Sequence, residues 1–483
     1  MTALRRSIGF AFLAAALVLI PSAVGAAGDL DRTFHGDGKV VTDLGADDYA
    51  FDVAVQRDGK IVAVGVSYLP VGSDFWIARY TAAGALDASF GSGGIIRPDF
   101  GDFGSGNAVV IQADGKIVVA GQAGILPNAT SDFALARYNR DGSLDASFDG
   151  DGRVFTDFGF GDVVNALAIQ SDGKIIAAGI AKSSSSRDAN EFGVARYNRD
   201  GSLDATFDGD GRVLTAFTPL TDSAVDAVVQ PDGKIVVGGF ANFSWEPPRN
   251  LEYALARYNA DGSLDAGFDG DGKVTTTPGT YTADVALQAD GKILLAGRQV
   301  LSYNRDGSLG SSFGAGGKLP DAGVSALLVQ PDAKIIAVGD VRGDFSIARL
   351  HPSGQDDHSF AAGLTDFGPG TDDLASAAAL QPDRKIVVAG SSSVRGQRAN
   401  LALARYLNPP PPQCVVPRVR GKTLRIARRT VARGRCAVGR VTRKHSTRVK
   451  NGRVISQSRR PGLRLPVGSR VNLVLSKGRP RSR

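Results

Sequence analysis

The stretch QADGKIVVAG at residues 112–121 decides how this chain folds, because it comes back along the sequence. Counting this one there are seven copies, and their starts lie 42 to 60 residues apart. Self-similarity at such a period indicates a repeat architecture, in which each copy is one structural unit. The other copies begin at Gln56, Gln170, Gln230, Gln288, Gln330 and Gln381.

Each copy predicts a β-hairpin. Asp-Gly between two apolar runs favours a type I′ turn, which needs positive φ at both central residues. Five copies keep Asp-Gly, but the sixth has Asp332-Ala333 and the seventh Asp383-Arg384, so we expect those turns to be strained or of another type. The apolar run after the turn is typical of a strand that is covered on both faces.

A second module follows each hairpin, and it shows how the chain ends meet. In the second repeat it reads Ala-Arg-Tyr at 136–138 and then Leu-Asp-x-x-Phe at 144–148. The last Ala-Arg-Tyr, at 404–406, has no such tail, whereas the chain carries a lone Leu-Asp-x-x-Phe at 30–34. We therefore expect the two ends to join in a closed ring.

The repeats predict an all-β fold, a seven-bladed β-propeller of four-stranded blades over residues 28–408. Roughly 54 residues per repeat suffice for four short strands and their turns. In the first repeat the strands are expected at 39–44, 51–56, 60–65 and 75–80. Four-stranded sheets repeated radially make a propeller. An open β-solenoid is the alternative, but it needs distinct end caps.

The repeat pattern resembles a known family. The run Gln-x-Asp-Gly-Lys-Ile, then Ala-Arg-Tyr-Asn-x-Asp-Gly-Ser-Leu-Asp-x-x-Phe, is similar to the delta-60 repeat, a bacterial repeat regarded as propeller-forming. The resemblance covers nearly all of residues 29–406. It implies a fold and no activity.

Residues 1–27 are predicted to be a signal peptide. Arg5 and Arg6 precede an apolar run at 8–20, and small residues at 24–27 suit cleavage. An uncleaved anchor helix is the rival, but about 13 apolar residues are too few to span a bilayer. We expect a secreted, extracellular or cell-wall-associated protein, a monomer, without a membrane span once the signal is removed.

Beyond a Pro-rich linker at 409–413, the charge of the chain inverts. Of its 56 Lys and Arg residues, 22 lie in 411–483, where there is no Asp or Glu, which leaves 34 against all 49 acidic residues elsewhere. The net charge of +7 therefore hides an acidic ring and a basic tail. Such a tail could bind an anionic envelope polymer or nucleic acid.

Residues 414–478, followed by a basic tail at 479–483, resemble a PASTA domain. The resemblance rests on Val-Val-Pro at 415–417, Gln-Ser at 457–458, Pro-Gly at 461–462 and Gly-x-x-Val at 468–471. It implies a small α+β fold, one helix against a three-stranded sheet, and a link to peptidoglycan. Separately, Cys414 and Cys436 are the only cysteines of an exported domain with a small core, which favours a disulfide between them.

Residues that recur in most blades are expected to serve the blade rather than a ligand. The Arg of Ala-Arg-Tyr and the Asp of Leu-Asp-x-x-Phe recur in register, so we predict blade-to-blade ion pairs or turn caps, because buried charges normally come paired. The Asp-rich run at 139–151 also resembles part of a calcium loop. Asx turns explain it without an ion. We expect no cofactor or metal, with calcium as the open alternative.

Variation between blades points to a binding face instead. The loop between the hairpin and the Ala-Arg-Tyr strand differs from blade to blade, and its richest copy, at 240–249, holds Phe243, Trp245 and Arg249. Because aromatic residues and Arg dominate binding hot spots, these three are the candidate ligand-binding residues, for a protein or a glycan. The alternative is that Trp245 folds over its own loop.

Catalytic motifs do not stand out in the sequence. The four histidines lack metal-ligand spacing, and no nucleophile elbow, His-Glu-x-x-His or phosphate loop occurs. The sequence therefore favours an exported, non-enzymatic binding or scaffold protein. A secreted enzyme with its site in the propeller channel remains the alternative, because such a site can use residues distant in sequence.

Overall fold

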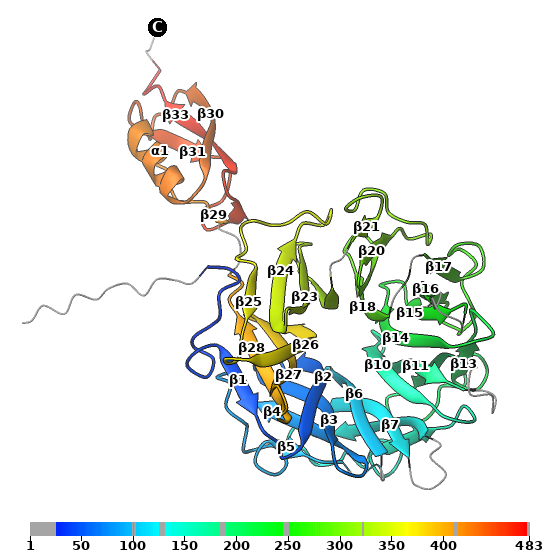
Figure 1. Cartoon of the computed structure of the whole chain (residues 1–483). Coiled ribbons are helices and arrows are strands. Elements are labelled where there is room, and N and C mark those ends of the chain that lie inside the picture. The colour runs from blue at the N-terminus through cyan, green and yellow to red at the C-terminus, as the bar shows by residue number, and fades with distance from the viewer. Residues whose placement is uncertain are drawn as a thin grey trace, which may run out of the picture. The chain divides into compact units, whose positions relative to one another are not determined.

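A computed structural model describes residues 26–98, 100, 103–124, 131–182, 190–244, 251–277, 279, 281–320, 323–409 and 413–480. The chain divides after Asn408 into two compact units, residues 1–408 and 409–483. The first unit is all β, and its sheets stand around a common centre (Figure 1). No helix in these ranges is long and apolar enough to cross a membrane.

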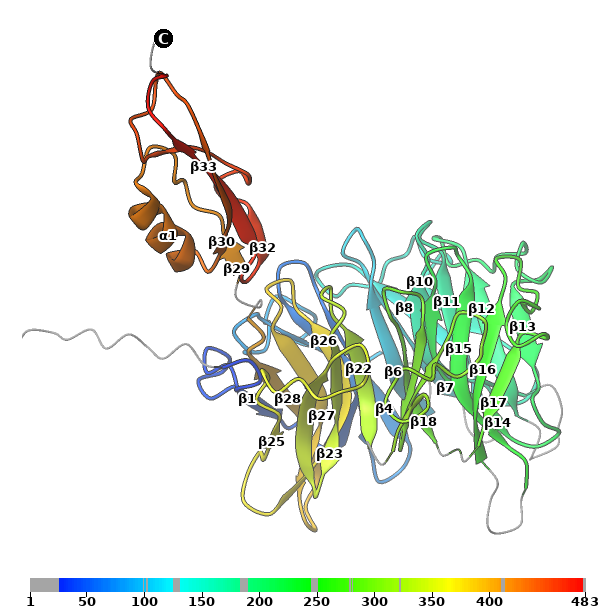
Figure 2. The same ribbon diagram turned by 90° about the horizontal axis from the view of Figure 1, so that it is seen from above.

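The first unit is a seven-bladed propeller of four-stranded antiparallel blades, and one parallel pair, Ser73 with Phe103, joins the sheets of the first two blades. The first blade consists of β2 (Asp47–Val55), β3 (Ile61–Tyr68), β4 (Ser73–Tyr80) and β5 (Ile95–Ile96), from the centre outward. Figure 2 shows the ring turned by 90°, with the strands of successive blades side by side. The next five blades are β6 (Phe103–Ile111), β7 (Ile117–Gly124), β8 (Ser131–Tyr138), β9 (Arg153–Thr156); β10 (Val163–Ile169), β11 (Ile175–Ala181), β12 (Glu191–Tyr197), β13 (Arg212–Thr215); β14 (Asp222–Val229), β15 (Ile235–Asn242), β16 (Leu251–Tyr258), β17 (Lys273–Thr276); β18 (Thr282–Leu287), β19 (Ile293–Gly297), β20 (Val300–Tyr303), β21 (Lys318–Leu319); and β22 (Val324–Val329), β23 (Ile335–Val341), β24 (Asp344–Leu350), β25 (Gly363–Thr365).

The seventh blade closes the ring with a strand from the beginning of the chain. Its inner strands are β26 (Thr371–Leu380), β27 (Ile386–Val394) and β28 (Ala399–Tyr406), and its outer strand is β1 (Lys39–Thr42). The pairing runs from Lys39 opposite Ala404 to Thr42 opposite Leu401. The expected meeting of the two ends is confirmed.

This closure decides the strand phase, which the sequence leaves open. The segment at 39–44, the first strand of the first sequence repeat, is the fourth strand of the last blade. The reason is local: the Leu-Asp-x-x-Phe turn brings the following strand back against the Ala-Arg-Tyr strand, as Tyr138 opposite Leu144 shows in the second blade. Each repeat in the sequence thus straddles two blades.

The recurrent Asp-Gly turn is also of another type than predicted. Gly115 donates its amide to the carbonyl of Gln112, and Gln112 donates to the carbonyl of Lys116. Gly115 has φ +88°, while Asp114 is not among the residues with positive φ. This is a three-residue loop, a type I turn followed by one left-handed residue. Ala333 (φ 64°) and Arg384 (φ 75°) take the glycine position in the sixth and seventh copies, so the expected strain is present there.

The core lies between the blades, because the middle strands are covered on both faces. Residues Ile61 to Val64 are all fully buried, and Val62 and Val64 pack with Val109 and Ala134 of the next blade. The glycine that ends each hairpin motif also has a structural reason. A Cβ on Gly121 would lie 1.7 Å from the carbonyl oxygen of Ser105 on the inner strand. Only glycine permits this close approach.

The second unit is a small α+β domain. It contains one helix, α1 (Leu424–Arg433), whose Ala427 and Val431 are buried against the sheet residues Val471 and Leu473. β33 lies between β30, which is parallel to it, and β31, which is antiparallel. The strands are β29 (Gln413–Val415), β30 (Ala437–Lys444), β31 (Val454–Gln457), β32 (Arg464–Pro466) and β33 (Arg470–Ser476).

Candidate functional site

The propeller has two faces of different chemistry. Strands alternate in direction within a blade, so the Asp-Gly turns and the Leu-Asp-x-x-Phe turns lie on one face, which we call the turn face. The connections from the second to the third strand and from blade to blade lie on the other, the loop face.

On the turn face the recurrent charges neutralise one another. In the first blade Asp87 Oδ2 accepts from Arg79 Nε at 2.8 Å and lies 2.9 Å from Lys60 Nζ. Arg79 also lies over the Phe90 ring, 4.2 Å from its centroid, and donates to the carbonyl of Arg140 in the next blade. These side chains hold the turn and the next blade in place. The recurrent Arg and Asp thus serve the blade and cap its turn, but the predicted blade-to-blade ion pair is wrong: Arg79 and Asp87 belong to one blade, and the contact with the next blade is a hydrogen bond to a carbonyl.

The electrostatics of this cluster explain why its charges are tolerated. Burial alone would raise the pKa of Asp87, but hydrogen bonds from Ser89 and Lys60 and the charge of Arg79 hold it below its usual value. The same three-residue cluster recurs, with equivalent contacts, in five further blades. Its members there are Lys116, Arg137 and Asp145; Lys174, Arg196 and Asp204; Lys234, Arg257 and Asp265; Lys334, Arg349 and Asp357; and Lys385, Arg405 and Asp31.

The fifth blade lacks this cluster. Ser302 stands at the position of the arginine and Gly310 at that of the aspartate, so both charges are missing together. The hydroxyl of Ser302 is buried without a hydrogen-bond partner among the described residues. The joint loss follows from the cost of burying either charge alone.

The Asp-rich run at 139–151 serves turns and ion pairs. Asp141 Oδ1 accepts from the amide (3.0 Å) and the hydroxyl (2.7 Å) of Ser143. Asp145 pairs with Arg137 and Lys116. These contacts are the predicted Asx turn and the ion pairs of Asp145.

The central channel is the first candidate site, and sequence reasoning did not find its residues. All seven inner strands carry a β-bulge at the same level. The bulge turns polar side chains toward the centre, among them Asp52, Asn107, Asn165, Asp226 and Asp284, which line a cavity of about 240 Å³. Repeat comparison gives a weak signal for the three aspartates, since all four other copies have Ala at this position.

These channel groups bond to the neighbouring blade. Asp52 Oδ2 accepts from the amide of Val109 (2.8 Å), and Asp226 Oδ2 accepts from that of Val285 (2.8 Å). Asn107 Nδ2 donates to the carbonyl of Val164 (2.8 Å). The ring of polar side chains therefore joins the inner strands.

Burial raises the pKa values of the channel carboxyls. Burial raises the pKa of Asp52 to about 7, although backbone hydrogen bonds act in the opposite direction. Burial and then the charge of Asp226 raise the pKa of Asp284 well above its ordinary value. Such groups can donate or accept a proton, which is the chemistry that a channel enzyme would require.

The loop face is the second candidate site. Phe243 follows β15 and is 42% exposed. Trp245 and Arg249 lie outside the described residues, so their predicted role stays a prediction. The other tryptophan, Trp76, is fully buried in β4. Further large apolar side chains are exposed on loop-face segments: Tyr68, Leu69, Val71, Phe160, Tyr281, Val341 and Val394.

The third candidate site is the basic surface of the second unit. Every described Lys and Arg of this unit except Lys422 is exposed. Arg425, Arg429 and Arg433 follow one another at four-residue steps along α1, opposite its buried Ala427 and Val431. No acidic residue occurs in 411–483 to neutralise this charge.

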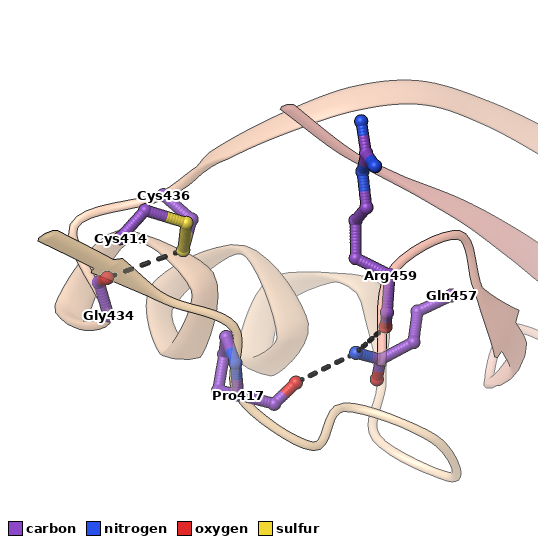
Figure 3. Close-up of a disulfide and its surroundings, with 6 residues drawn as sticks. All are labelled: Cys414, Pro417, Gly434, Cys436, Gln457 and Arg459. Atoms are coloured by element: carbon purple, nitrogen blue, oxygen red, sulfur yellow. Dashed lines mark hydrogen bonds between the residues drawn. A yellow bond between two sulfur atoms is a disulfide. The ribbon is translucent and has the colours of Figure 1, made fainter. Parts of the chain in front are cut away.

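The motif residues of this unit are structural. Gln457 Oε1 accepts from the amide of Val419 (2.9 Å), and its Nε2 donates to the carbonyls of Pro417 (2.9 Å) and Arg459 (3.0 Å), as Figure 3 shows for the two carbonyls. Cys414 and Cys436 form the predicted disulfide, which ties β29 to the residue that follows the helix by three positions. The disulfide fits a protein of an oxidising, extracellular or envelope compartment.

The architecture defines a class, a seven-bladed β-propeller joined to a small, basic α+β domain. Six segments of the propeller match the family described as "Domain of unknown function (DUF5122) beta-propeller", and residues 415–477 match the PASTA domain. The propeller therefore belongs to the DUF5122 family, with which the predicted delta-60 resemblance agrees, and the second unit is a PASTA domain. The matched segments are 56–90, 112–148, 170–207, 230–268, 330–360 and 381–408.

Similar solved structures include a catalytically inactive virginiamycin B lyase from Staphylococcus aureus, with 10% identity over 76% of this chain and 98% of the other and a TM-score of 0.46. A periplasmic gluconolactonase from Pseudomonas aeruginosa has 14% identity over 75% of this chain and 95% of the other, with a TM-score of 0.41. The extracellular region of the Ser/Thr kinase PrkC from Staphylococcus aureus has 27% identity over 13% of this chain and 22% of the other, with a TM-score of 0.13. None of the curated proteins matches the chain.

Proposed function

We propose that this protein is an exported, non-enzymatic binding protein of the cell envelope. Its basic PASTA domain docks on an anionic polymer of the wall, and its propeller presents the loop face to a protein or glycan. A PASTA domain and a disulfide support a cell-wall or extracellular setting. The strongest support for docking on an anionic polymer is the positive charge of the second unit.

That charge is unfavourable in the isolated domain. Like charges four residues apart on a helix repel each other by about 0.2–0.5 kcal/mol per pair, and Arg425, Arg429 and Arg433 supply two such pairs. A polymer with repeated phosphate or carboxylate groups relieves this repulsion. Arginine suits both groups, because its planar guanidinium donates two parallel hydrogen bonds.

The enzyme alternative depends on the channel carboxyls. A non-enzymatic role is favoured because each of the channel carboxyls Asp52, Asp226 and Asp284 already accepts a backbone amide of the next blade. An activity that Asp52→Asn abolishes while the fold is retained would favour the enzyme.

The experiment that tests the proposal compares binding to purified cell walls with and without their anionic polymer. The full chain, the chain ending at Asn408, and an Arg425→Gln/Arg429→Gln/Arg433→Gln variant are measured, with Arg→Lys at the same positions as the matched control. We expect binding of the full chain to intact walls, weaker binding of the Gln variant, and a smaller loss for the Lys variant.

Three outcomes distinguish binding to anionic polymer, binding to peptidoglycan and binding to nucleic acid. Retention on neither wall preparation would refute docking through the tail. Equal retention on walls stripped of anionic polymer would indicate that peptidoglycan itself is bound. Binding to DNA that is tighter than binding to walls at the same salt would favour the nucleic-acid reading, for which salt dependence alone is not diagnostic.

A further inference from the structure

Two junctions between blades gather three aspartates each on the loop face. The members occupy equivalent positions: the start of a third strand, the connection after the fourth strand, and the start of the next inner strand. In each set one carboxylate oxygen per residue lies within 4.8 Å of the others. The first set is Asp132, Asp157 and Asp162, and the second is Asp344, Asp366 and Asp373.

In the first set the innermost carboxylate is fully used by the protein. Asp162 is buried, and its Oδ2 accepts from the amide of Phe158 at 2.8 Å. Its Oδ1 accepts from the amide of Lys182 at 3.0 Å. This set therefore has a structural explanation.

In the second set one oxygen is left over. Asp373 is fully buried, and its Oδ2 accepts from the amide of Phe367 (2.9 Å) and the hydroxyl of Thr371 (3.0 Å). Its Oδ1 has no hydrogen-bond partner in the described part of the chain. A buried carboxylate oxygen without a partner is costly, so the site calls for a ligand or a further donor.

The difference has a cause in the strand pairing. In the third blade the ladder ends with Val163 opposite Ile180, and the amide of Lys182 is free to turn onto Asp162. In the last blade the ladder continues beyond Asp373 to Thr371 opposite Val394. The longer ladder leaves no equivalent amide for Asp373.

The second set also lies in acidic surroundings. Burial, and then the charge of Asp372, raise the pKa of the neighbouring Asp340. Lys39 Nζ donates to the main-chain carbonyl of Asp366 (2.8 Å) and not to its carboxylate. Among the described residues no lysine or arginine forms an ion pair with any member of the set.

From these observations we propose that Asp344, Asp366 and Asp373 bind one Ca²⁺ ion on the loop face, at the junction of the sixth and seventh blades. Calcium takes oxygen ligands at about 2.3–2.6 Å, so oxygens on opposite sides of the ion lie about 4.6–5.2 Å apart. The three carboxylate oxygens lie within 4.8 Å of one another, so one ion can contact all of them. Calcium is the cation of choice because it accepts irregular sets of carboxylate oxygens, whereas Mg²⁺ demands a near-ideal octahedron. The ion fixes the start of β24 to the connection that leads into β26.

The test uses the full chain after treatment with a chelator. Thermal unfolding and titration calorimetry are measured with CaCl₂ and with MgCl₂, for the natural protein, for Asp366→Asn and for Asp157→Asn, the matched change in the first set. We expect one calcium site and a rise of the melting temperature, with affinity reduced at least tenfold by Asp366→Asn and unchanged by Asp157→Asn. Magnesium is expected to bind more weakly.

Two results would overturn the proposal. The first is no heat and no shift of the melting temperature up to 10 mM CaCl₂, or a response that Asp366→Asn keeps. The second result concerns Ser392, which lies opposite Asp373 in the strand ladder. In the first blade Ser67 lies opposite Asp48 in the same way, and its hydroxyl donates to Asp48 Oδ1 at 2.5 Å. If Ser392→Ala destabilises the calcium-free protein and calcium does not restore it, a hydroxyl and not an ion completes the site.

Discussion

Replacing Asp31 by Asn is expected to open the closure of the ring. Asp31 Oδ2 accepts from Arg405 Nε (2.9 Å) and lies 3.1 Å from Lys385 Nζ, and the side chains of Asp31 and Arg405 are 3% and 4% exposed. Asparagine keeps one oxygen, which can still accept from the amide and hydroxyl of Thr33, but its NH₂ group faces the two donors Arg405 and Lys385. Arg405 then becomes a buried charge without a counterion, which costs about 3–5 kcal/mol.

The interior control is Asp204→Asn. Asp204 pairs with Arg196 and with Lys174, both at 2.6 Å, but only eight residues separate it from the arginine. In the closing blade the separation is 374 residues. We expect similar losses in the free energy of unfolding, measured in denaturant, but different local effects. Asp31→Asn frees a chain end, so amide hydrogen exchange in β1 accelerates, whereas Asp204→Asn leaves β13 held at both ends.

The double variant Asp31→Gly/Arg405→Ser copies the fifth blade, which has Gly310 and Ser302. It should cost less than the sum of the single changes, with a coupling of about 0.5–3 kcal/mol. A loss below about 1 kcal/mol for Asp31→Asn, additive single changes, or equal acceleration of exchange in β13 and β1 would refute this account of the closure.

Three further predictions concern other parts of the chain. Burial raises the pKa of Asp52 to about 7 in the folded protein, so its contribution to stability falls as the pH rises from about 4 to 7. Asp52→Asn should therefore raise the melting temperature at pH 8 and leave it nearly unchanged at pH 4. An equal effect at both pH values would contradict this explanation. Ala333→Gly should stabilise the propeller by about 0.5–1 kcal/mol in denaturant unfolding, since Ala333 has φ 64°, and a loss would show that the turn is not strained. The disulfide closes a loop between cysteines that are 22 residues apart. Removing it by Cys414→Ala/Cys436→Ala should lower the free energy of unfolding of the PASTA domain by about 3 kcal/mol. An unchanged thermal transition would contradict this contribution of the disulfide to stability.

Much of the fold follows from the sequence because the same local pattern of residues occurs seven times. The lone Leu-Asp-x-x-Phe at 30–34 predicts closure, since the last Ala-Arg-Tyr at 404–406 would otherwise leave Arg405 without its aspartate. The paired loss of Arg and Asp in the fifth blade is visible for the same reason. The sequence did not predict the type of the Asp-Gly turn, because the dipeptide is compatible with two hairpin geometries. The hydrogen bonds of Gln112 show which of the two is present.

The sequence by itself thus determined the architecture, the disulfide and the separation of a basic domain from an acidic ring, because these depend on periodicity, composition and spacing. Only the tertiary structure decided which residues meet. Asp52, Asp226 and Asp284 come from three different repeats and converge because each inner strand bulges toward one axis. Asp162 and Asp373 occupy equivalent positions in the sequence, yet three more pairs in one ladder leave a single oxygen of Asp373 without a partner among the described residues. A difference of that size depends on the register of strands that the repeat pattern does not encode.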